Sequence, residues 1–137
     1  MSKPMPRITA VNRPYWEGCN ADKLMLQRCT AADCGQYIFY PRVCCPHCGD
    51  GDPVWEQVSG RGQVLSYTLV QRPHHESFYA EAPFVFAAVT LEEGPLIYGR
   101  IEIDAAEAEG LNGRPVAIVF RDDQLPGQKL PFFRLTA

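Results

Sequence analysis

The chain has 137 residues, 46% hydrophobic and 21% charged, which is the composition of an ordinary globular protein. No apolar run approaches the ~18 residues that a membrane span requires, so we expect a soluble protein with no membrane partner. The formal net charge of -3 disfavours a nucleic-acid partner. At this length the chain has room for one domain, or for one domain plus an appendage too small to bury its own core.

Residues 1–22 predict an arm and a short helix. Residues 1–12 read as a loose arm, and Pro14 opens a helix in the run RPYWEGCN, because proline is favoured in the first turn of a helix. One short helix is not stable alone, so Tyr15 and Trp16 need a surface on which to pack. Two alternatives stay open: the two rings dock on this chain's own domain, or they anchor the chain in a groove of a partner.

Residues 23–53 carry two cysteine pairs with the spacing of a zinc site, each followed by a glycine that allows a sharp turn. The predicted metal ligands are Cys29, Cys34, Cys45 and Cys48. Strands predicted at residues 23–28 and 36–41 form a hairpin around the first pair. This is the zinc-ribbon plan, in which two short hairpins each present two ligands and the metal substitutes for a hydrophobic core. Zinc is therefore the predicted cofactor, in a closed structural site.

Alternatives to this ligand set are disulfides and a different choice of cysteine. Residues 1–13 contain no apolar run that could serve as a secretory signal, which predicts a cytoplasmic protein and argues against disulfides. Cys44 competes with Cys45, because Cys44 and Cys48 also have a permissible spacing. We prefer Cys45, which forms the tighter CPHC pair. Two further residues are not expected to bind the metal: Cys19 and His47.

Residues 54–137 read as strands separated by glycine or proline turns, the pattern of a small antiparallel barrel or sandwich. The predicted strands are residues 54–59, 62–71, 83–91, 96–103, 115–120 and 131–136. A short helix capped by Asp104 is predicted over residues 104–111. Five or six strands with one helical turn favour a Greek-key barrel of the OB type, although the pattern alone separates it poorly from other small barrels.

The order and spacing of several motifs resemble a known family over residues 13–134. The motifs are YWEG, LQRC, the run ending in YPR, CPHCG, Trp55, SGRGQVLSYTLV, PFVFAAVTLEEG and FRDD. They resemble the acyl-CoA-associated family of the domain-of-unknown-function type, in which a rubredoxin-like zinc ribbon is joined to an OB-fold. One departure is the first cysteine pair, which is usually C-x2-C in that family, whereas Cys29 and Cys34 enclose four residues.

The resemblance implies an accessory role beside a catalytic partner. Members of the family act with thiolases, thiolase-like aldolases or hydratases and support chemistry on acyl-CoA thioesters. It implies a non-catalytic subunit in a hetero-oligomer, with acyl-CoA held at or near the interface, in reactions such as carbon-carbon cleavage of steroid side-chain or fatty acyl-CoA. The sequence itself shows no nucleophile elbow and no phosphate-binding glycine loop. The alternatives are a nucleic-acid-binding zinc-ribbon and OB protein, or a stand-alone acyl-CoA enzyme.

Candidate contact residues gather in residues 72–83, which form a long loop for a small barrel. We place the working surface on this loop and at the join between ribbon and barrel. Candidates for contact with the partner or acyl-CoA are Arg61, Arg72, His74, His75, Phe78 and Tyr79. The guanidinium group of arginine suits phosphate oxygens, so Arg100 and Arg121 are further candidates for contact with a phosphate of CoA. Each candidate arginine could instead be an ordinary surface charge. The two histidines beside Glu76 could act as acid and base, and the two aromatic rings could plug the barrel.

Overall fold

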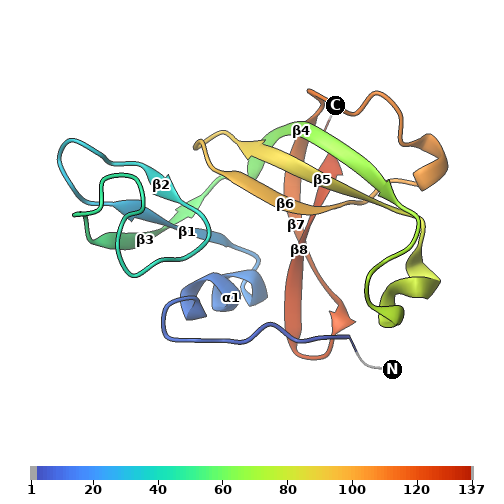
Figure 1. The fold of residues 1–137 in the computed structure, drawn as a ribbon, viewed down its shortest axis with the longest axis horizontal. Helices are drawn as coiled ribbons and strands as arrows, with labels where there is room; N and C mark the ends of the chain where they lie inside the picture. Colours follow the sequence, from blue (N-terminus) through green and yellow to red (C-terminus); the bar gives the residue numbers. More distant parts are fainter. Residues whose placement is uncertain (1–2, 137) are drawn as a thin grey trace.

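A three-stranded antiparallel sheet forms the zinc-ribbon half of the computed structural model, which describes residues 3–136 (Figure 1). Its strands, in the order β2-β1-β3, are β1 (Leu24–Cys29), β2 (Tyr37–Ile38) and β3 (Pro53–Val58). The predicted hairpin of β1 and β2 is confirmed, although β2 is shorter than expected. The second cysteine pair lies among turns and bends, so the second hairpin of the zinc-ribbon plan is absent from residues 39–52.

Strand β3 is the strand that we predicted as the first of the barrel. It pairs instead with β1 along its whole length, from Leu24 opposite Val58 to Cys29 opposite Pro53. Strand β2 pairs with only two residues of β1, so β3 supplies the neighbouring strand for the remaining residues of β1. The division of the chain into domains at residues 53 and 54 stays a prediction.

The rest of the chain forms a closed five-stranded barrel in the order β4-β5-β6-β8-β7, with β7 pairing back onto β4. Its strands are β4 (Arg61–Val70), β5 (Phe84–Leu91), β6 (Leu96–Ile101), β7 (Pro115–Leu125) and β8 (Gln128–Leu135). Gly62 lies where β4 pairs with β5 on one side and β7 on the other. A Cβ added there would lie 2.4 Å from the carbonyl oxygen of Thr90, so this closure requires glycine. The prediction of a mainly β fold is confirmed.

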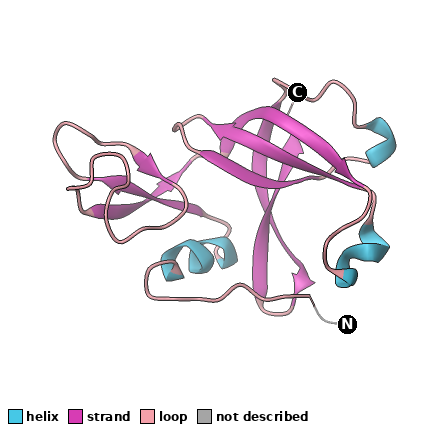
Figure 2. Cartoon of the chain, viewed as in Figure 1, coloured by secondary structure: helices cyan, strands magenta, loops and turns pink. Residues whose placement is uncertain are grey.

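Helices are short and few among the described residues (Figure 2). They are the α-helix α1 (Arg13–Asn20) and the 3-10 helices η1 (Glu76–Glu81) and η2 (Ala105–Glu107). The helix predicted over residues 104–111 is therefore reduced to the single turn of η2. Asp104 caps it as expected, since its carboxylate accepts a hydrogen bond from the N–H of Ala106 at 3.0 Å. The helical conformation ends before Gly110, because the φ of 65° at Gly110 does not continue a right-handed helix. None of the helices in residues 3–136 has the length and apolar character needed to cross a membrane.

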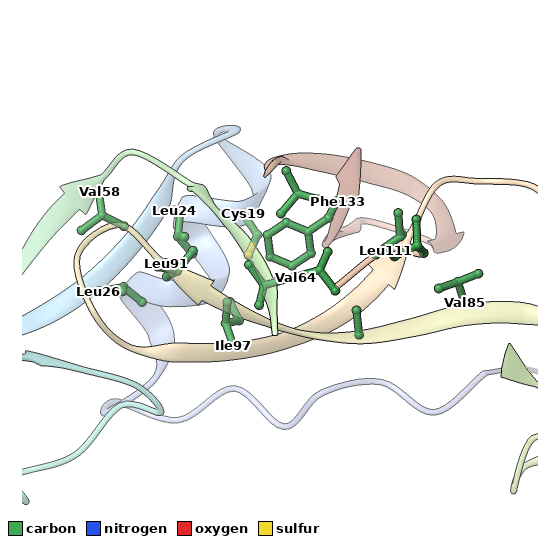
Figure 3. Close-up of a cluster of buried hydrophobic side chains, with 14 of the residues drawn as sticks. Cys19, Leu24, Leu26, Val58, Val64, Val85, Leu91, Ile97, Leu111 and Phe133 are labelled. Atoms are coloured by element: carbon green, nitrogen blue, oxygen red, sulfur yellow. The ribbon is translucent and has the colours of Figure 1, made fainter. Parts of the chain in front are cut away.

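One hydrophobic core joins the helix, the ribbon and the barrel (Figure 3). Tyr15 and Cys19 of α1 pack in the same cluster as Leu24 and Leu26 of β1 and Phe133 of β8. All five side chains are almost completely buried. The ribbon is therefore held to the barrel by shared core packing as well as by the chain connection.

Helix α1 docks on this chain's own barrel, which is the first of the two alternatives. The carbonyl oxygen of Trp16 accepts a hydrogen bond from the side-chain amide of Gln128 at 3.3 Å. The side-chain oxygen of Asn20 accepts one from the N–H of Lys129 at 2.8 Å. Both bonds fix the helix at the start of β8, with Tyr15 buried in the core and Trp16 partly buried against it.

The segment preceding α1 is anchored, contrary to the prediction of a loose arm. Asn12 is buried, and its side-chain oxygen accepts a hydrogen bond from the N–H of Thr9 at 2.7 Å. Its side-chain nitrogen donates to the hydroxyl of Tyr40 in the ribbon at 3.1 Å. Lys3 forms an ion pair with Glu81 on the far side of the barrel. Residues 1, 2 and 137, at the ends of the expected arm and barrel, lie outside the described residues.

Candidate metal centre and contact surfaces

Four cysteine sulfurs converge at the tip of the ribbon. Cys29 ends β1 and Cys34 lies in the turn that follows, whereas Cys45 and Cys48 lie in the second loop. All four sulfurs lie within 4.8 Å of one another. The Sγ atoms of Cys29 and Cys48 are 3.6 Å apart, and those of Cys34 and Cys45 are 3.8 Å apart. A tetrahedral zinc with bonds of about 2.3 Å needs sulfurs about 3.8 Å apart, so this donor set fits a four-thiolate zinc.

Backbone N–H groups point at two of these sulfurs. The N–H of Ala31 lies 3.4 Å from the Sγ of Cys29, and the N–H of His47 lies 3.4 Å from the Sγ of Cys45. Hydrogen bonds to an anionic sulfur favour the thiolate, which is the form that binds metal. The two contacts occupy equivalent positions, two residues after the first cysteine of each pair, so each turn supports its own ligand.

Three glycines shape the metal site, two of them as predicted. Gly35 and Gly49 have φ angles of 65° and 81°, the left-handed conformation that lets the chain turn after each second cysteine. Gly51 matters for a different reason, since a Cβ added there would lie 2.0 Å from the Sγ of Cys29. The sequence analysis missed Gly51, because its role comes from a contact across the loop rather than from its own backbone angles.

The remaining cysteines and His47 lie outside the four-sulfur cluster. Cys44 is exposed and is not part of the four-sulfur cluster, so the structure brings Cys45 and not Cys44 to the metal position. Cys19 is buried in the core, where burial raises the pKa of its thiol to about 12. The ring of His47 lies 3.3 Å from the carbonyl oxygen of Tyr37. With four sulfurs around the metal there is no open position for a substrate, so the site is structural.

Ion pairs occupy most of the candidate arginines. Arg61 is exposed and pairs with Glu92, whose hydrogen bond raises the pKa of the guanidinium. Arg121 donates two hydrogen bonds to Glu102, at 2.7 and 2.8 Å. Arg72 is exposed and lies at a small hollow beside Tyr79. Arg100 and Arg121 line one cavity, but each is paired there with a carboxylate, Arg100 with Glu81 and Arg121 with Glu102.

The two candidate histidines have separate surroundings. His74 is exposed, whereas His75 caps η1 by accepting a hydrogen bond from the N–H of Ser77 at 3.2 Å. The same ring nitrogen lies 2.6 Å from the hydroxyl of Ser77. A ring engaged in this way at a helix start is a structural cap, so the two histidines do not form an acid and base pair.

Phe78 and Tyr79 also differ in their surroundings. Phe78 is half-buried, with the amine of Lys3 5.2 Å from its ring centre and the ring of His75 at 6.4 Å. Tyr79 is 49% exposed. The two rings therefore differ in this geometry: Phe78 packs against Lys3 of the segment that precedes α1, and Tyr79 faces solvent.

The ribbon–barrel join and the loop lie at opposite ends of the barrel, with the ribbon at the left and η1 at the right (Figure 1). At the join, a crevice separates the ribbon from the turn between β5 and β6. Arg28, Phe39 and His47 line it on the ribbon side, and Glu93 and Leu96 on the barrel side. A partner that contacts both predicted surfaces must therefore extend along the length of the barrel.

Two family models match consecutive parts of the chain. Residues 16–54 match the rubredoxin-like zinc ribbon domain of ChsH2, and residues 55–121 match the C-terminal OB-fold domain of ChsH2. The chain belongs to the ChsH2 or DUF35 family. The predicted resemblance, the OB type of the barrel and the structural zinc of this DUF35 protein are thereby confirmed.

Relatives of this DUF35 protein include scaffold proteins and a hydratase subunit. A DUF35 domain-containing scaffold protein of Methanothermobacter thermautotrophicus is 34% identical over 69% of this chain and 71% of its own length. One of Pyrococcus furiosus is 34% identical over 64% of this chain and 62% of its own. The probable enoyl-CoA hydratase alpha subunit of Thermomonospora curvata is 35% identical over 96% of this chain but only 40% of its own length. The chain thus spans less than two thirds of two of these relatives.

A solved structure matches over almost the whole length of both chains. A chain of the Ltp2-ChsH2(DUF35) aldolase is 33% identical, with a TM-score of 0.81, and the match covers 97% of this chain and 100% of that chain. Ribbon, helix and barrel therefore have the same mutual arrangement in both proteins.

Proposed function

We propose that this chain is a non-catalytic accessory subunit of an acyl-CoA enzyme. Its partner is a thiolase-fold aldolase or thiolase, or a hydratase, in a hetero-oligomer. The observation that carries this proposal is the match over 97% of this chain to a chain of the Ltp2-ChsH2(DUF35) aldolase. The names of two relatives, a scaffold protein and a hydratase alpha subunit, support the same role.

The chemistry of the described residues supports a role without catalysis by this chain alone. The four-thiolate site offers no open metal position at which a water or a substrate oxygen could be activated. His75 is engaged as a helix cap, and His74 stands apart from it on the surface. The partner would therefore supply the nucleophile, the acid and the base.

The accessory subunit would support the reaction through position. It would hold its partner and help to close the acyl-CoA site, with the thioester at or near the interface, in the cytoplasm. Excluding water and ordering a substrate are contributions that a subunit can make without touching the reacting atoms. Carbon-carbon cleavage of a steroid side-chain or fatty acyl-CoA is the reaction that we propose for the complex.

Co-expression tests this proposal. The chain should co-purify with a thiolase-fold protein or a hydratase encoded beside it, and mass spectrometry should identify that partner. Acyl-CoA turnover should be absent for this chain alone and highest for the mixture of the two proteins. Robust turnover by this chain alone, or full activity of the partner without it, would contradict the accessory role.

A further inference from the structure

The outer face of strands β4, β5 and β6 is almost free of charge. Strand β5 turns Val85, Ala87 and Val89 into the core with at most 1% exposure, so alternate residues of the three strands point outward. We call these residues the uncharged face: Ser66, Thr68, Val70, Phe84, Phe86, Ala88, Thr90, Leu96, Tyr98 and Arg100. Arg100 is its single ionised residue, and it is paired with Glu81 at 2.6 Å.

Two aromatic rings lie at the centre of the uncharged face. Phe86 and Tyr98 are 39% and 56% exposed. Their rings are nearly parallel, with an angle of 4° between the planes and 6.2 Å between the centroids. The small residue Ala88 is paired with Tyr98 across the strands and is 8% exposed. Arg100 is paired with Phe86 across the strands, and its charge is already paired with Glu81. Exposed aromatic rings are typical of the centre of protein interfaces.

A β-bulge adds an aliphatic side chain to the same surface. The pairing of β4 with β5 shifts between Val64 and Ser66, so Leu65 has no partner across the strands. Val64 is buried, whereas Leu65 is 57% exposed. Bulges redirect side chains, and this one turns a leucine outward on a strand whose inward positions are already filled.

Ion pairs border the uncharged face at both ends. Arg61 and Glu92 are 3.2 Å apart near the start of β4. At the other end Glu81 binds both Arg100 and Lys3, and the guanidinium of Arg100 lies 4.0 Å from the ring centre of Phe84. The charges at the border are thus satisfied within this chain. An apolar centre with a polar rim is the usual anatomy of a protein interface.

We infer that the uncharged face docks the partner subunit, through an apolar and uncharged patch of that subunit. This inference rests on the proposed accessory function and adds the surface to it. Charge complementarity selects this occupant, because a charged partner group would lose its hydration here without gaining a counter-charge. A nucleic acid fits poorly for the same reason, since its phosphates would meet only Arg100, which already binds Glu81.

The size of the uncharged face argues against a second copy of this chain. Three strands spaced about 5 Å apart over about seven residues cover roughly 10 by 25 Å, or about 250 Å². This area is far below the ~800 Å² that each partner buries in a standard interface. A two-fold dimer centred on this face would gain little further apolar area at its two ends, because ion pairs border the face there. A larger partner can add contacts at the crevice beside the ribbon, which lies next to Leu96 at the end of β6.

Threonine substitutions test the inference on the full chain. The double variant Phe86→Thr with Tyr98→Thr removes both rings and keeps strand preference, so its melting temperature should stay within about 3 °C of the wild type. The probe is the thiolase-fold or hydratase subunit encoded beside this chain. Its Kd should rise at least tenfold, as expected for the loss of two interface aromatics. The matched control is Val54→Thr on β3, a residue with 46% exposure, which should leave the Kd unchanged.

A second variant and a salt series give independent readouts. Leu65→Asp places one charge at the bulge beside the uncharged face without altering the two rings, and it should also raise the Kd at least tenfold. The wild-type Kd should change less than about threefold between 50 and 500 mM NaCl, because few charges meet across such an interface.

The outcomes separate the inference from the function on which it rests. If the wild type binds the subunit and both variants bind equally well, the uncharged face is not the interface, and the accessory function stands. If the wild type binds neither a thiolase-fold protein nor a hydratase, both proposals are wrong. If sedimentation shows that the wild type self-associates and the variants do not, the occupant is a second copy, and the inference is overturned.

Discussion

Gln27 and Arg42 are joined by two hydrogen bonds that tie the second metal-binding loop to β1. The side-chain oxygen of Gln27 accepts from the N–H of Arg42 at 2.7 Å, and its side-chain nitrogen donates to the carbonyl oxygen of Arg42 at 2.8 Å. The amide thus pairs with the loop backbone as a neighbouring strand would, and Gln27 is only 5% exposed. The loop that carries Cys45 and Cys48 is therefore positioned by a side chain of β1 as well as by the metal.

Gln27→Met should lower the free energy of unfolding by about 2 kcal/mol, because the variant keeps the side-chain volume but loses both hydrogen bonds between this buried side chain and the backbone of Arg42. It should also weaken zinc binding in a chelator competition, since the second loop loses its attachment. The control is Gln36→Met at an exposed position of the first loop, which should change neither quantity. Equal zinc affinity of wild type and Gln27→Met would show that the metal alone positions the loop.

Cys45→Ser should abolish zinc binding, whereas Cys44→Ser should retain one zinc per chain. Of these two cysteines, only Cys45 has its sulfur in the four-sulfur cluster, and Cys44 is exposed. Because metal binding and folding of the ribbon are coupled, chelation should also unfold the ribbon. Metal analysis of the two purified variants checks the prediction, and the reverse pattern would show that Cys44 is the ligand.

Gly51→Ala should impair zinc binding at least tenfold, because the added Cβ would lie 2.0 Å from the Sγ of Cys29 and must displace it. The matched control is Gly49→Asn. A Cβ at position 49 meets nothing within 4 Å, and asparagine tolerates the φ of 81° found there. Zinc competition titrations of both variants measure the difference, and equal affinities would mean that the loop moves aside at little cost.

Glu102 should make folding stability depend on pH in the acid range. The hydrogen bond from Arg121 lowers the pKa of this carboxyl in the folded protein below its ordinary value of 4.5. The unfolded state therefore binds a proton first as the pH falls. The stabilisation is fully present above pH 4.5 and is lost as the pH falls through the lowered pKa, with a size of about 0.5 kcal/mol for a partly exposed pair.

The variant Glu102→Gln isolates this contribution. The difference in unfolding free energy between wild type and variant should be constant from pH 7 to about pH 5 and should shrink below it. Denaturant unfolding of both proteins at the same pH values measures this difference. Because the pH values match, any loss of zinc in acid affects both proteins equally. A difference that grows as the pH falls would contradict the sign.

Phe78→Ala and Tyr79→Ala should have different effects. Phe78 is half-buried between Lys3 and His75, so its loss should lower the melting temperature by several degrees. Tyr79 is 49% exposed, so its loss should leave the melting temperature unchanged and weaken binding of the partner subunit. Thermal melts and pull-downs of the two single variants decide between plug and contact. Normal partner binding by Tyr79→Ala would show that the loop is not part of the interface.

Local patterns in the sequence were sufficient for the zinc ribbon and for most of the barrel. Cysteine spacing predicted a zinc site because a tight turn delivers two sulfurs whatever the rest of the fold does, and the four predicted sulfurs do converge. Apolar runs bounded by glycine and proline turns predicted β5 and β6 to within two residues, since such runs are typical of strands. Asp104 capped a helix as expected, although the helix proved to be one turn.

Contacts between distant segments were decided only by the tertiary structure. The pairing of β3 with β1, the burial of Tyr15 and the attachment of Lys3 to Glu81 each join parts that local patterns treat separately. Gln27 lies on the face of β1 opposite the core residues Leu24 and Leu26, so neither its burial nor its partner Arg42 could be predicted without the path of the loop.

The sequence by itself determined the metal-binding plan and the strand-rich barrel, because ligand spacing and the two-residue period of a strand are local properties of the chain. Only the tertiary structure decided which side chains became surface. Phe86, Tyr98 and Leu65 are large apolar side chains of predicted strands, yet they lie outside, because a closed barrel has one interior and Val64, Val85 and Ile97 already fill it.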